Sequence, residues 1–416
     1  MPVYTSSNGV EAVELTIKLI QGKGLAAKDR NMMGQRTTSD PYCIVELMTT
    51  LPPVGRKKSP TVTTKIGQSE VIKKTVDPEW NYEVTTSIPG TALANTDSPP
   101  TLKFSLFDYD KGSDDDPMGF VTIPVPNSVK SVDSTEWYEI PKTSVKNAKG
   151  KLQIQFKTQV YRATALQKGN AFVLNTNKIR IGLAWDVEKG KAIDLDASCV
   201  AITKDGKVAM DDCVYYGNLK NSNQSVVHSG DEREGNAEGE DESITFQLDK
   251  IPSNILCMYI ILTVASVKRN MSHITSARVT IVDETKPTQG AMAVFSPAEH
   301  VQSSDATAMY LVRLARVGGD SSNRGWKVQP IEDTHPTARD FGSLIPYLKS
   351  YTSDLIPGIQ VNPTERCSVM RKGGNISIKD FTPTNAIPNK VTFGKFPFLI
   401  CFVLYCIVLY CDILFI

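Results

Sequence analysis

The chain has 416 residues, of which 41% are hydrophobic and 22% are charged, and its formal net charge is +1. This length and composition are typical of a globular protein with about two domains. A chain so close to neutral has no excess of basic residues for bulk binding of nucleic acid, so we exclude that class of partner.

The N-terminus and the cysteines favour a cytoplasmic location. Residues 1–7 contain neither a basic stretch nor an apolar one, so we expect no secretory signal peptide. No cysteines form a CxxC pair, and Cys43 and Cys257 fall within apolar, strand-like runs, as reduced core thiols do. The four histidines are not spaced as a zinc-binding pair, so we expect no zinc chemistry.

Closely spaced carboxylates mark the first third of the chain. Asp108 and Asp110 follow segment 102–106, whose alternation of apolar and polar residues predicts a half-buried strand. Both acids therefore emerge on one face at a strand end, and Asp116 follows six residues after Asp110. Their mutual repulsion would raise at least one pKa, and a divalent cation with oxygen ligands relieves that cost. The pattern predicts one wall of a calcium site.

A second acidic half lies upstream, and the complete set of acidic motifs follows a fixed order. The motifs are Asp29, Ser39-Asp40-Pro41-Tyr42, Asp77-Pro78-Glu79-Trp80-Asn81, Asp108-Tyr109-Asp110 and Asp116-Pro117-Met118-Gly119. In this order they resemble a C2 domain, the calcium- and phospholipid-binding module of protein kinase C and synaptotagmin. The resemblance covers residues 10–158 and implies a β-sandwich whose calcium ions bridge to anionic lipid head groups. Carried over residue by residue, it implies the calcium ligands Asp29, Asp40, Asp108, Asp110 and Asp116.

The first loop departs from the C2 pattern, because the stretch from Lys28 to Ser39 is several residues longer than is common. A C2 fold that has lost calcium binding is the alternative interpretation, although such members usually lack one or more of these acids. Asp114 and Asp115 have no match in the family motif, so we expect them to form a solvated charge run.

Basic and apolar residues near the acidic loops suggest contact with lipid. A Lys or Arg near an anionic bilayer surface contributes about 1 kcal/mol to membrane attraction. An ordinary solvated position is the alternative for the lysines, and a buried loop position is the alternative for the methionines. The residues that we predict to contact lipid are Lys57, Lys58, Lys73, Lys74, Met32 and Met33.

A second domain begins after Tyr161 and is also predicted to be a β-sandwich. Apolar residues alternate with polar or small ones along 179–185, and 255–267 is an almost continuous apolar run. Apolar residues at helical spacing along 341–348 predict a C-terminal helix with Pro346 in its first turns. The expected fold class is therefore dominated by β-structure, with two sandwich domains and a few helices.

Acidic residues recur in the second domain. Asp194 and Asp196 lie with Ser198 on one face of an extended segment, and 230–242 is an acidic loop interrupted by glycines. Glycines allow such a loop to turn its carboxylates and carbonyls toward a cation. The loop does not match the twelve-residue pattern of an EF-hand, so we exclude that geometry.

The motifs of this second domain also follow a fixed order. They are Gly182-Leu183-Ala184-Trp185-Asp186, Asp194-Leu195-Asp196-Ala197-Ser198, Val214-Tyr215-Tyr216, Gly230-Asp231, Gly239-Glu240-Asp241-Glu242, Gly325-Trp326-Lys327 and Ala338-Arg339-Asp340-Phe341. They resemble the TerD domain of the tellurium-resistance and stress-response family over residues 164–359. The resemblance implies a calcium-binding β-sandwich. Its implied ligands are Asp194, Asp196, Asp231, Asp241 and Glu242, with Glu238 and Glu240 as weaker candidates.

The acidic loop departs from the TerD pattern at several positions. Glu232 stands where an asparagine is usual, Ala237 replaces a glycine, and Glu238 and Glu240 replace aspartates. Longer side chains would lower the calcium affinity or change the number of ions bound, and a solvated acidic loop is the alternative. We expect His228 to be a surface or packing residue rather than a ligand, because calcium prefers oxygen.

These patterns divide the chain into four regions. Residues 1–160 form the predicted C2 domain, 164–360 the TerD-type domain and 361–395 a polar linker. Residues 396–416 are apolar apart from Pro397 and Asp412, and as a helix they would span about 31 Å, close to the thickness of a bilayer core. Two interpretations of this tail stay open, namely a transmembrane anchor and translated non-coding sequence.

The leading hypothesis is a non-enzymatic protein in which calcium fills the C2 loops and brings the TerD-like domain to an anionic phospholipid membrane. The sequence contains no GxSxG, P-loop, GxGxxG or HExxH motif. Two alternatives remain: a calcium-binding scaffold with protein partners in a stress or metal-resistance complex and, less favoured, a calcium-dependent hydrolase.

Overall fold

The computed structural model divides the chain into two compact units. One comprises Tyr4–Ala163 and Lys286–Met292, and the other comprises Met1–Val3, Thr164–Thr285 and Ala293–Ile416. Both units are built mainly from strands, which confirms the predicted fold class. The structure describes residues 9–29, 33–35, 37–50, 61–94, 98–125, 132–187, 193–230, 240–266, 268–297, 305–317, 325–365, 367, 392–393 and 414–415.

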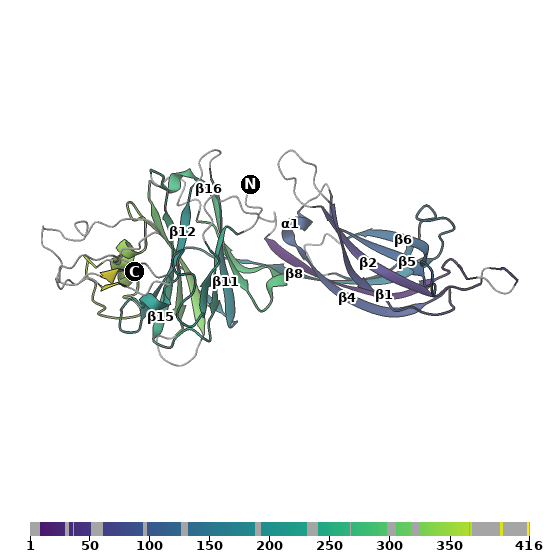
Figure 1. Cartoon of the computed structure of the whole chain (residues 1–416), viewed down its shortest axis with the longest axis horizontal. Coiled ribbons are helices and arrows are strands. Elements are labelled where there is room, and N and C mark those ends of the chain that lie inside the picture. Colours follow the sequence, from purple (N-terminus) through teal and green to yellow (C-terminus); the bar gives the residue numbers. More distant parts are fainter. Residues whose placement is uncertain are drawn as a thin grey trace, which may run out of the picture. The chain divides into compact units, whose positions relative to one another are not determined.

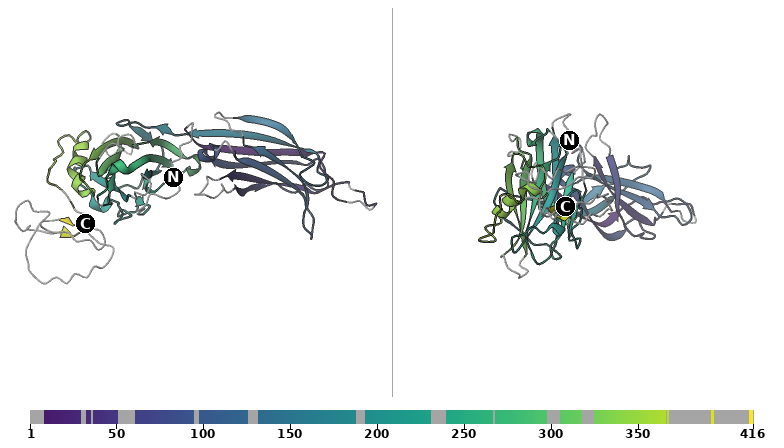
Figure 2. Two further views of the ribbon diagram at one scale, coloured as in Figure 1. Left: turned by 90° about the horizontal axis from the view of Figure 1, so that it is seen from above. Right: turned by 60° about the vertical axis from the view of Figure 1, so that its left-hand side comes forward.

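The first unit is a sandwich of two four-stranded antiparallel sheets, with strand orders β4-β1-β8-β7 and β3-β2-β5-β6. Figure 1 shows β1, β4 and β8 side by side, and the views in Figure 2 show the strands in layers. A short helix, α1 (Gly90–Leu93), follows β4. The strands are β1 (Val10–Lys23), β2 (Pro41–Thr50), β3 (Thr61–Gln68), β4 (Glu79–Pro89), β5 (Thr101–Asp108), β6 (Asp116–Pro124), β7 (Asp133–Glu139) and β8 (Lys151–Arg162).

The core of the first unit follows from alternation along its strands. Leu15, Ile17 and Leu19 of β1 are buried, whereas the intervening residues are more exposed, because successive side chains of a strand point to opposite faces. Phe104 of β5 and Phe156 of β8 meet edge to face between the sheets, with ring centroids 6.5 Å apart. The predicted half-buried strand at 102–106 is therefore confirmed as part of β5.

The second unit pairs a five-stranded sheet, β10-β19-β18-β15-β12, with a six-stranded sheet, β13-β14-β11-β16-β17-β9. Single 3-10 turns interrupt the connections at η1 (Met210–Asp212) and η2 (Met271–His273), and a further turn, η3 (Pro287–Gln289), lies in the segment that belongs to the first unit. The strands are β9 (Thr164–Ala165), β10 (Phe172–Leu174), β11 (Lys178–Val187), β12 (Leu195–Thr203), β13 (Val226–His228), β14 (Glu242–Gln247), β15 (Ile255–Val264), β16 (Ile274–Asp283), β17 (Ala291–Phe295), β18 (Ala308–Arg316) and β19 (Trp326–His335).

Two predicted features of the second unit are confirmed. Every residue of β15 is buried, as its continuous apolar run indicated. The predicted helix is η4 (Gly342–Leu344) followed by α3 (Ile345–Tyr351), with Pro346 in the first turn, where a proline ring is tolerated. Thr352, just after α3, hydrogen-bonds the Tyr259 hydroxyl of β15 over 2.9 Å, which ties the helix to the sheet.

The predicted linker and tail lie largely outside the described residues. Of these two regions, the structure describes residues 361–365 and 367, together with two short strands, β20 (Thr392–Phe393) and β21 (Leu414–Phe415), which pair in parallel. Within the described parts of the chain, no helix is both long enough and apolar enough to cross a bilayer. The prediction of buried core thiols is confirmed for Cys43 and Cys257. All five described cysteines are free and buried: Cys43, Cys199, Cys213, Cys257 and Cys367.

Candidate functional site

One end of the first unit gathers the acidic motifs because of strand register. The antiparallel pairing places Pro41, the first residue of β2, opposite Asp108, the last residue of β5. Asp108 in turn pairs with Asp116, the first residue of β6. Antiparallel neighbours start and end at the same edge of a sheet, so the loops 24–40 and 109–115 meet at this end.

Two backbone amides and one side-chain hydroxyl hold three of the predicted ligands. The Asp40 amide donates to Oδ1 of Asp108, and the Lys74 amide donates to Oδ1 of Asp40 over 2.6 Å. Lys74 has a φ of 55°, a left-handed conformation that turns its amide toward Asp40. The Thr38 hydroxyl donates to Oδ2 of Asp29 over 3.2 Å. These bonds connect the 24–40 loop to β5 and to the 69–78 connection between β3 and β4.

Asp108 lies at the centre of the acidic cluster. It is 1% exposed, and burial raises the pKa of its carboxyl group to about 6, with the charges of Asp29 and Asp110 adding to the increase. Hydrogen bonds from Asp40 and Ser39 oppose this shift without cancelling it. Ionisation of Asp108 is therefore less favourable in the folded protein than in an unfolded chain, and a nearby positive charge would offset this cost.

Neighbouring carboxylates also raise the pKa of Asp110. Desolvation raises its pKa, and the neighbouring carboxylates of Asp116, Asp29 and Asp115 raise it further. Four of the five predicted ligands thus lie close enough to affect one another electrostatically, and the fifth, Asp40, is hydrogen-bonded to Asp108 through its backbone.

Hard oxygen donors with mutual repulsion match what calcium favours in a protein site. Nevertheless, the described residues include no group of three or more His, Cys, Asp or Glu side chains arranged closely enough to hold a metal ion. The acidic end therefore has the composition and the electrostatics of a cation site, whereas its side chains do not form a closed coordination sphere.

Asp115 does not behave as predicted. The Tyr42 hydroxyl donates to its Oδ2 over 2.6 Å, and the Asp110 amide donates to its Oδ1 over 2.9 Å. These hydrogen bonds lower the pKa of Asp115. The prediction of a solvated charge was therefore wrong for Asp115, because only the folded chain brings Tyr42 of β2 and the Asp110 amide to this carboxylate, whereas Asp114 is exposed.

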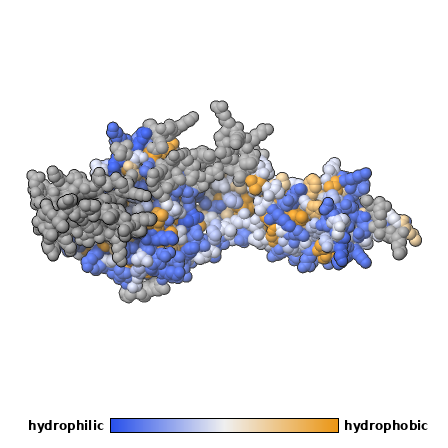
Figure 3. Space-filling view, viewed as in Figure 1, coloured by the Kyte–Doolittle hydropathy of each residue, from blue (hydrophilic) through white to orange (hydrophobic). Residues whose placement is uncertain are grey.

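The residues predicted to contact lipid are only partly described. Lys73 and Lys74 are exposed in the 69–78 connection, and Met33 is 86% exposed in the 24–40 loop. Lys57, Lys58 and Met32 lie outside the described residues. On the face seen in Figure 3, hydrophilic residues cover much of the described surface, and apolar residues form small separate patches.

In the second unit, the side chains of Glu242 and His228 contact backbone groups of the edge strand β12. Glu242 is 1% exposed and accepts a hydrogen bond of 2.8 Å from the amide of Ala197. The buried His228 ring places Nε2 3.1 Å from the Ala197 carbonyl and 3.5 Å from Oε2 of Glu242, and its Nδ1 accepts from the Gly230 amide. Buried backbone groups of an edge strand need such partners. His228 is therefore a packing residue, as expected, with a defined hydrogen-bonding role.

Other acids of the second unit also contact protein donors. Oδ2 of Asp241 accepts from the Trp185 amide over 2.8 Å. Glu240 forms an ion pair with Arg180 and accepts from the Thr280 hydroxyl over 2.6 Å. Its carboxyl group lies over Gly182, where an added Cβ would stand 1.9 Å from the Glu240 Cδ atom. Glu240 is therefore engaged in a half-buried ion pair, which its place in an acidic run did not indicate.

The remaining predicted ligands of the second unit are divided between described and undescribed segments. Asp196 on β12 is buried, and the Asp194 amide donates to the Ser266 hydroxyl over 2.9 Å. Asp231 and Glu238 lie outside the described residues, as does most of the acidic loop. The structure consequently describes the strand side of this predicted site and not its loop.

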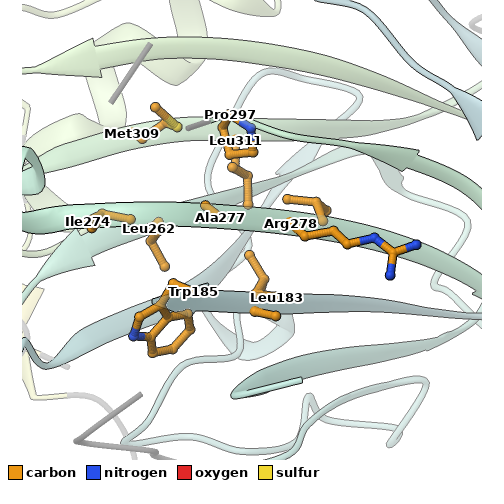
Figure 4. Close-up of a pocket in the computed structure, with 11 residues that line it drawn as sticks. Leu183, Trp185, Leu262, Ile274, Ala277, Arg278, Pro297, Met309 and Leu311 are labelled. Carbon is orange, nitrogen blue, oxygen red and sulfur yellow. The ribbon is translucent and has the colours of Figure 1, made fainter. Parts of the chain in front are cut away.

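An apolar pocket lies between the two sheets of the second unit (Figure 4). The Arg278 guanidinium extends away from the labelled apolar side chains. The lining includes no His, Ser, Cys or carboxylate that could serve as a nucleophile or a general base, so this pocket gives the hydrolase alternative no support. The lining residues are Leu183, Ala184, Trp185, Leu262, Ile274, Ala277, Arg278, Val279, Pro297, Met309 and Leu311.

Comparison with known proteins identifies two family models in this chain. The model described as C2 domain matches residues 13–140, and the model described as TerD domain matches residues 163–338. The first match contains the acidic end built around Asp108, and the second contains Glu242 and its partners. Both resemblances inferred from the sequence motifs are thereby confirmed.

Individual relatives agree with the family models. Tellurium resistance protein TerD of Serratia marcescens is 31% identical over 159 residues, which cover 37% of this chain and 78% of that protein. Uncharacterized protein YceE of Bacillus subtilis is 34% identical over 181 residues, which cover 41% of this chain and 90% of that protein. Protein C2-DOMAIN ABA-RELATED 4 of Arabidopsis thaliana is 33% identical over 105 residues, which cover 25% of this chain and 44% of that protein.

Proposed function

Because the chain belongs to the TerD family and carries a C2 domain ahead of its TerD domain, we propose that it is a cytoplasmic, calcium-responsive stress protein. In this proposal the C2 domain brings the TerD domain to an anionic phospholipid membrane, and neither domain is an enzyme. The names of relatives, which include tellurium resistance and general stress proteins, support the stress role.

The raised pKa of Asp108 is the observation that carries the proposal. Burial and the charges of Asp29 and Asp110 disfavour the ionised form, so the calcium-free site is strained electrostatically near neutral pH. A bound calcium ion would supply the compensating charge. The residues that would hold it are Asp29, Asp40, Asp108, Asp110 and Asp116.

Calcium would act in this proposal as an electrostatic switch. The acidic end repels an anionic membrane while it carries uncompensated carboxylates, and bound cations would reverse the local charge. The exposed Lys73 and Lys74 lie in the connection whose Lys74 amide contacts Asp40, so two basic residues belong to a segment that borders the proposed site. Met33 is exposed in the neighbouring loop and would add apolar contact with the bilayer.

The TerD domain supports a second proposed calcium site, with Asp194, Asp196, Asp241 and Glu242 on the described side and Asp231 in the loop. Glu242 and Asp241 are bonded to backbone amides, which favours a constitutive structural ion over a responsive one. This observation also favours the alternative function, in which the TerD domain is a calcium-stabilised scaffold for protein partners in a stress complex.

Sedimentation with liposomes tests the proposal. In the full chain, Asp108→Asn together with Asp110→Asn should abolish calcium-dependent sedimentation with vesicles that contain phosphatidylserine. The matched control is Asp114→Asn, which neutralises an exposed aspartate of the same loop and should sediment as the unmodified chain does. Unchanged sedimentation of the double variant would refute the proposed mechanism.

A further inference from the structure

Tyr42 is held rigidly at the start of β2, two residues after Asp40. Its side chain is 8% exposed, and its ring stacks on that of Phe107 with centroids 5.6 Å apart and planes 23° apart. Phe107 is also its register partner on β5, so the sheet itself fixes the ring. The position of the Tyr42 hydroxyl is therefore set by the sandwich and not by the loops around it.

Asp115 connects this fixed hydroxyl to the 109–115 loop. One carboxylate oxygen accepts from Tyr42 over 2.6 Å, and the other accepts from the Asp110 amide over 2.9 Å. Hydrogen bonds to a carboxylate are charge-assisted and are stronger than those between neutral groups. Both carboxylate oxygens of Asp115 therefore accept hydrogen bonds from the protein, and the bond from the Asp110 amide connects two residues of the same loop.

A second bond fastens the other end of the loop. The Tyr109 amide donates to the Asp40 carbonyl over 3.0 Å, so the chain beside Asp110 is attached to the strand that carries Tyr42. Asp110 and Asp116 stand on either side of the Asp115 anchor. Movement of the loop away from Tyr42 would therefore displace Asp110, whereas Asp116 is held by its pairing with Asp108 at the start of β6.

We propose that Tyr42 and Asp115 form a positioning pair that holds the 109–115 loop in its calcium-binding conformation without contacting the ion. The pair raises calcium affinity because the loop is ordered before the ion arrives, so less conformational entropy is lost on binding. This inference rests on the proposed function, since it concerns the same calcium site. It assigns to Asp115 a role that the acidic motif does not contain.

Calcium titration of the full chain without lipid tests the positioning pair. The readout is the calcium concentration that gives half-maximal protection from hydrogen exchange in the peptide spanning 109–115, which isolates the C2 site from the TerD domain. Tyr42→Phe keeps the stacked ring and removes only the hydroxyl, and it should raise this concentration about tenfold or more, as expected for the loss of one hydrogen bond to a charged group. The control is Tyr109→Phe, which removes the hydroxyl of an exposed tyrosine from the same loop and should leave the half-maximal calcium concentration unchanged.

A double-variant comparison separates positioning from simple loss of charge. Asp115→Ala should weaken binding at least as much as Tyr42→Phe, and the two changes together should be no worse than Asp115→Ala alone. Asp115→Asn, which keeps an acceptor oxygen, should recover part of the affinity. A role limited to stability would instead lower the unfolding temperature and leave the half-maximal calcium concentration unchanged.

The possible outcomes distinguish the two proposals. If the unmodified chain gains protection with calcium and Tyr42→Phe responds at the same concentration, the positioning pair is refuted and the calcium site stands. Additive effects of Tyr42→Phe and Asp115→Ala would also refute the pair. If calcium causes no protection in the unmodified chain, the proposed calcium function fails, and the role of the pair fails with it.

Discussion

The acidic residues of the two units differ in how they are stabilised. In the C2 unit, Asp108 and Asp110 lie among other carboxylates, and each has a raised pKa to which neighbouring negative charges contribute. In the TerD unit, Glu240 pairs with Arg180, and Glu242 contacts an amide and the His228 ring. The C2 carboxylates accept hydrogen bonds and also lie beside like charges, whereas Glu240 of the TerD unit lies beside a positive charge and Glu242 beside hydrogen-bonding groups.

This difference indicates that similar acidic motifs have different energetic consequences. Neutralising an electrostatically strained carboxylate, or binding a cation to it, should stabilise the unit that contains it. Removing a carboxylate that accepts hydrogen bonds from buried donors should destabilise its unit. Neutralising substitutions in the two units should therefore change stability in opposite directions.

The largest expected effect is a loss of stability in the TerD unit on Glu242→Ala. The substitution leaves the buried amide of Ala197 without its acceptor and removes the group next to His228, at a cost of about 3 kcal/mol in the free energy of unfolding. Hydrogen exchange of β12 and β14 in the full chain would measure it. Asp205→Ala, which removes an exposed partner of Lys207, should have little effect, and equal losses would contradict this interpretation.

A gain of stability is expected for Asp108→Asn in the absence of calcium. Asparagine keeps an oxygen for the Asp40 amide and removes a buried charge near Asp29 and Asp110, which should add about 2 kcal/mol to the unfolding free energy of the C2 unit. Chemical denaturation with a chelator present, followed by exchange in β5, would measure the change. A loss of stability would show that Asp108 is not strained.

The stability of the C2 unit should also depend on pH. Asp108 has a pKa of about 6 in the folded protein and about 3.9 in an unfolded chain, so the folded state binds the proton more tightly. Stability from this group is therefore fully present below pH 3.9 and is lost as the pH rises through 6, with a decrease of about 1 kcal/mol between pH 5 and pH 7. Urea titrations without calcium would show this loss of stability. In the Asp108→Asn variant, the part of the loss that comes from ionisation of Asp108 should be absent.

The smallest expected effect concerns the lysines beside the C2 site. Lys73→Gln should weaken calcium-dependent binding to anionic vesicles up to about fivefold, which corresponds to about 1 kcal/mol, and leave calcium affinity without lipid unchanged. Lys157→Gln, which removes a charge paired with Asp133 on β7, is the matched control. Equal effects of the two substitutions would show that net charge, and not the position of Lys73, determines lipid binding.

Much of the fold was predictable because local patterns agree with the final structure. The alternation at 102–106, the apolar run of β15 and the helical spacing before α3 each reflect the face that the element buries. The order of the acidic motifs was likewise sufficient to recognise both domains, since these motifs are contiguous in the chain.

The sequence by itself therefore determined the two β-sandwich domains and the acidic composition of their predicted sites. The tertiary structure decided which carboxylates have partners, because those partners come from distant strands. Asp115 of the 109–115 loop meets Tyr42 of β2, Glu240 meets Arg180 of β11, and Glu242 meets the edge strand β12. Hydrogen bonds and charge effects depend on distances of a few ångströms between residues, and folding alone sets those distances.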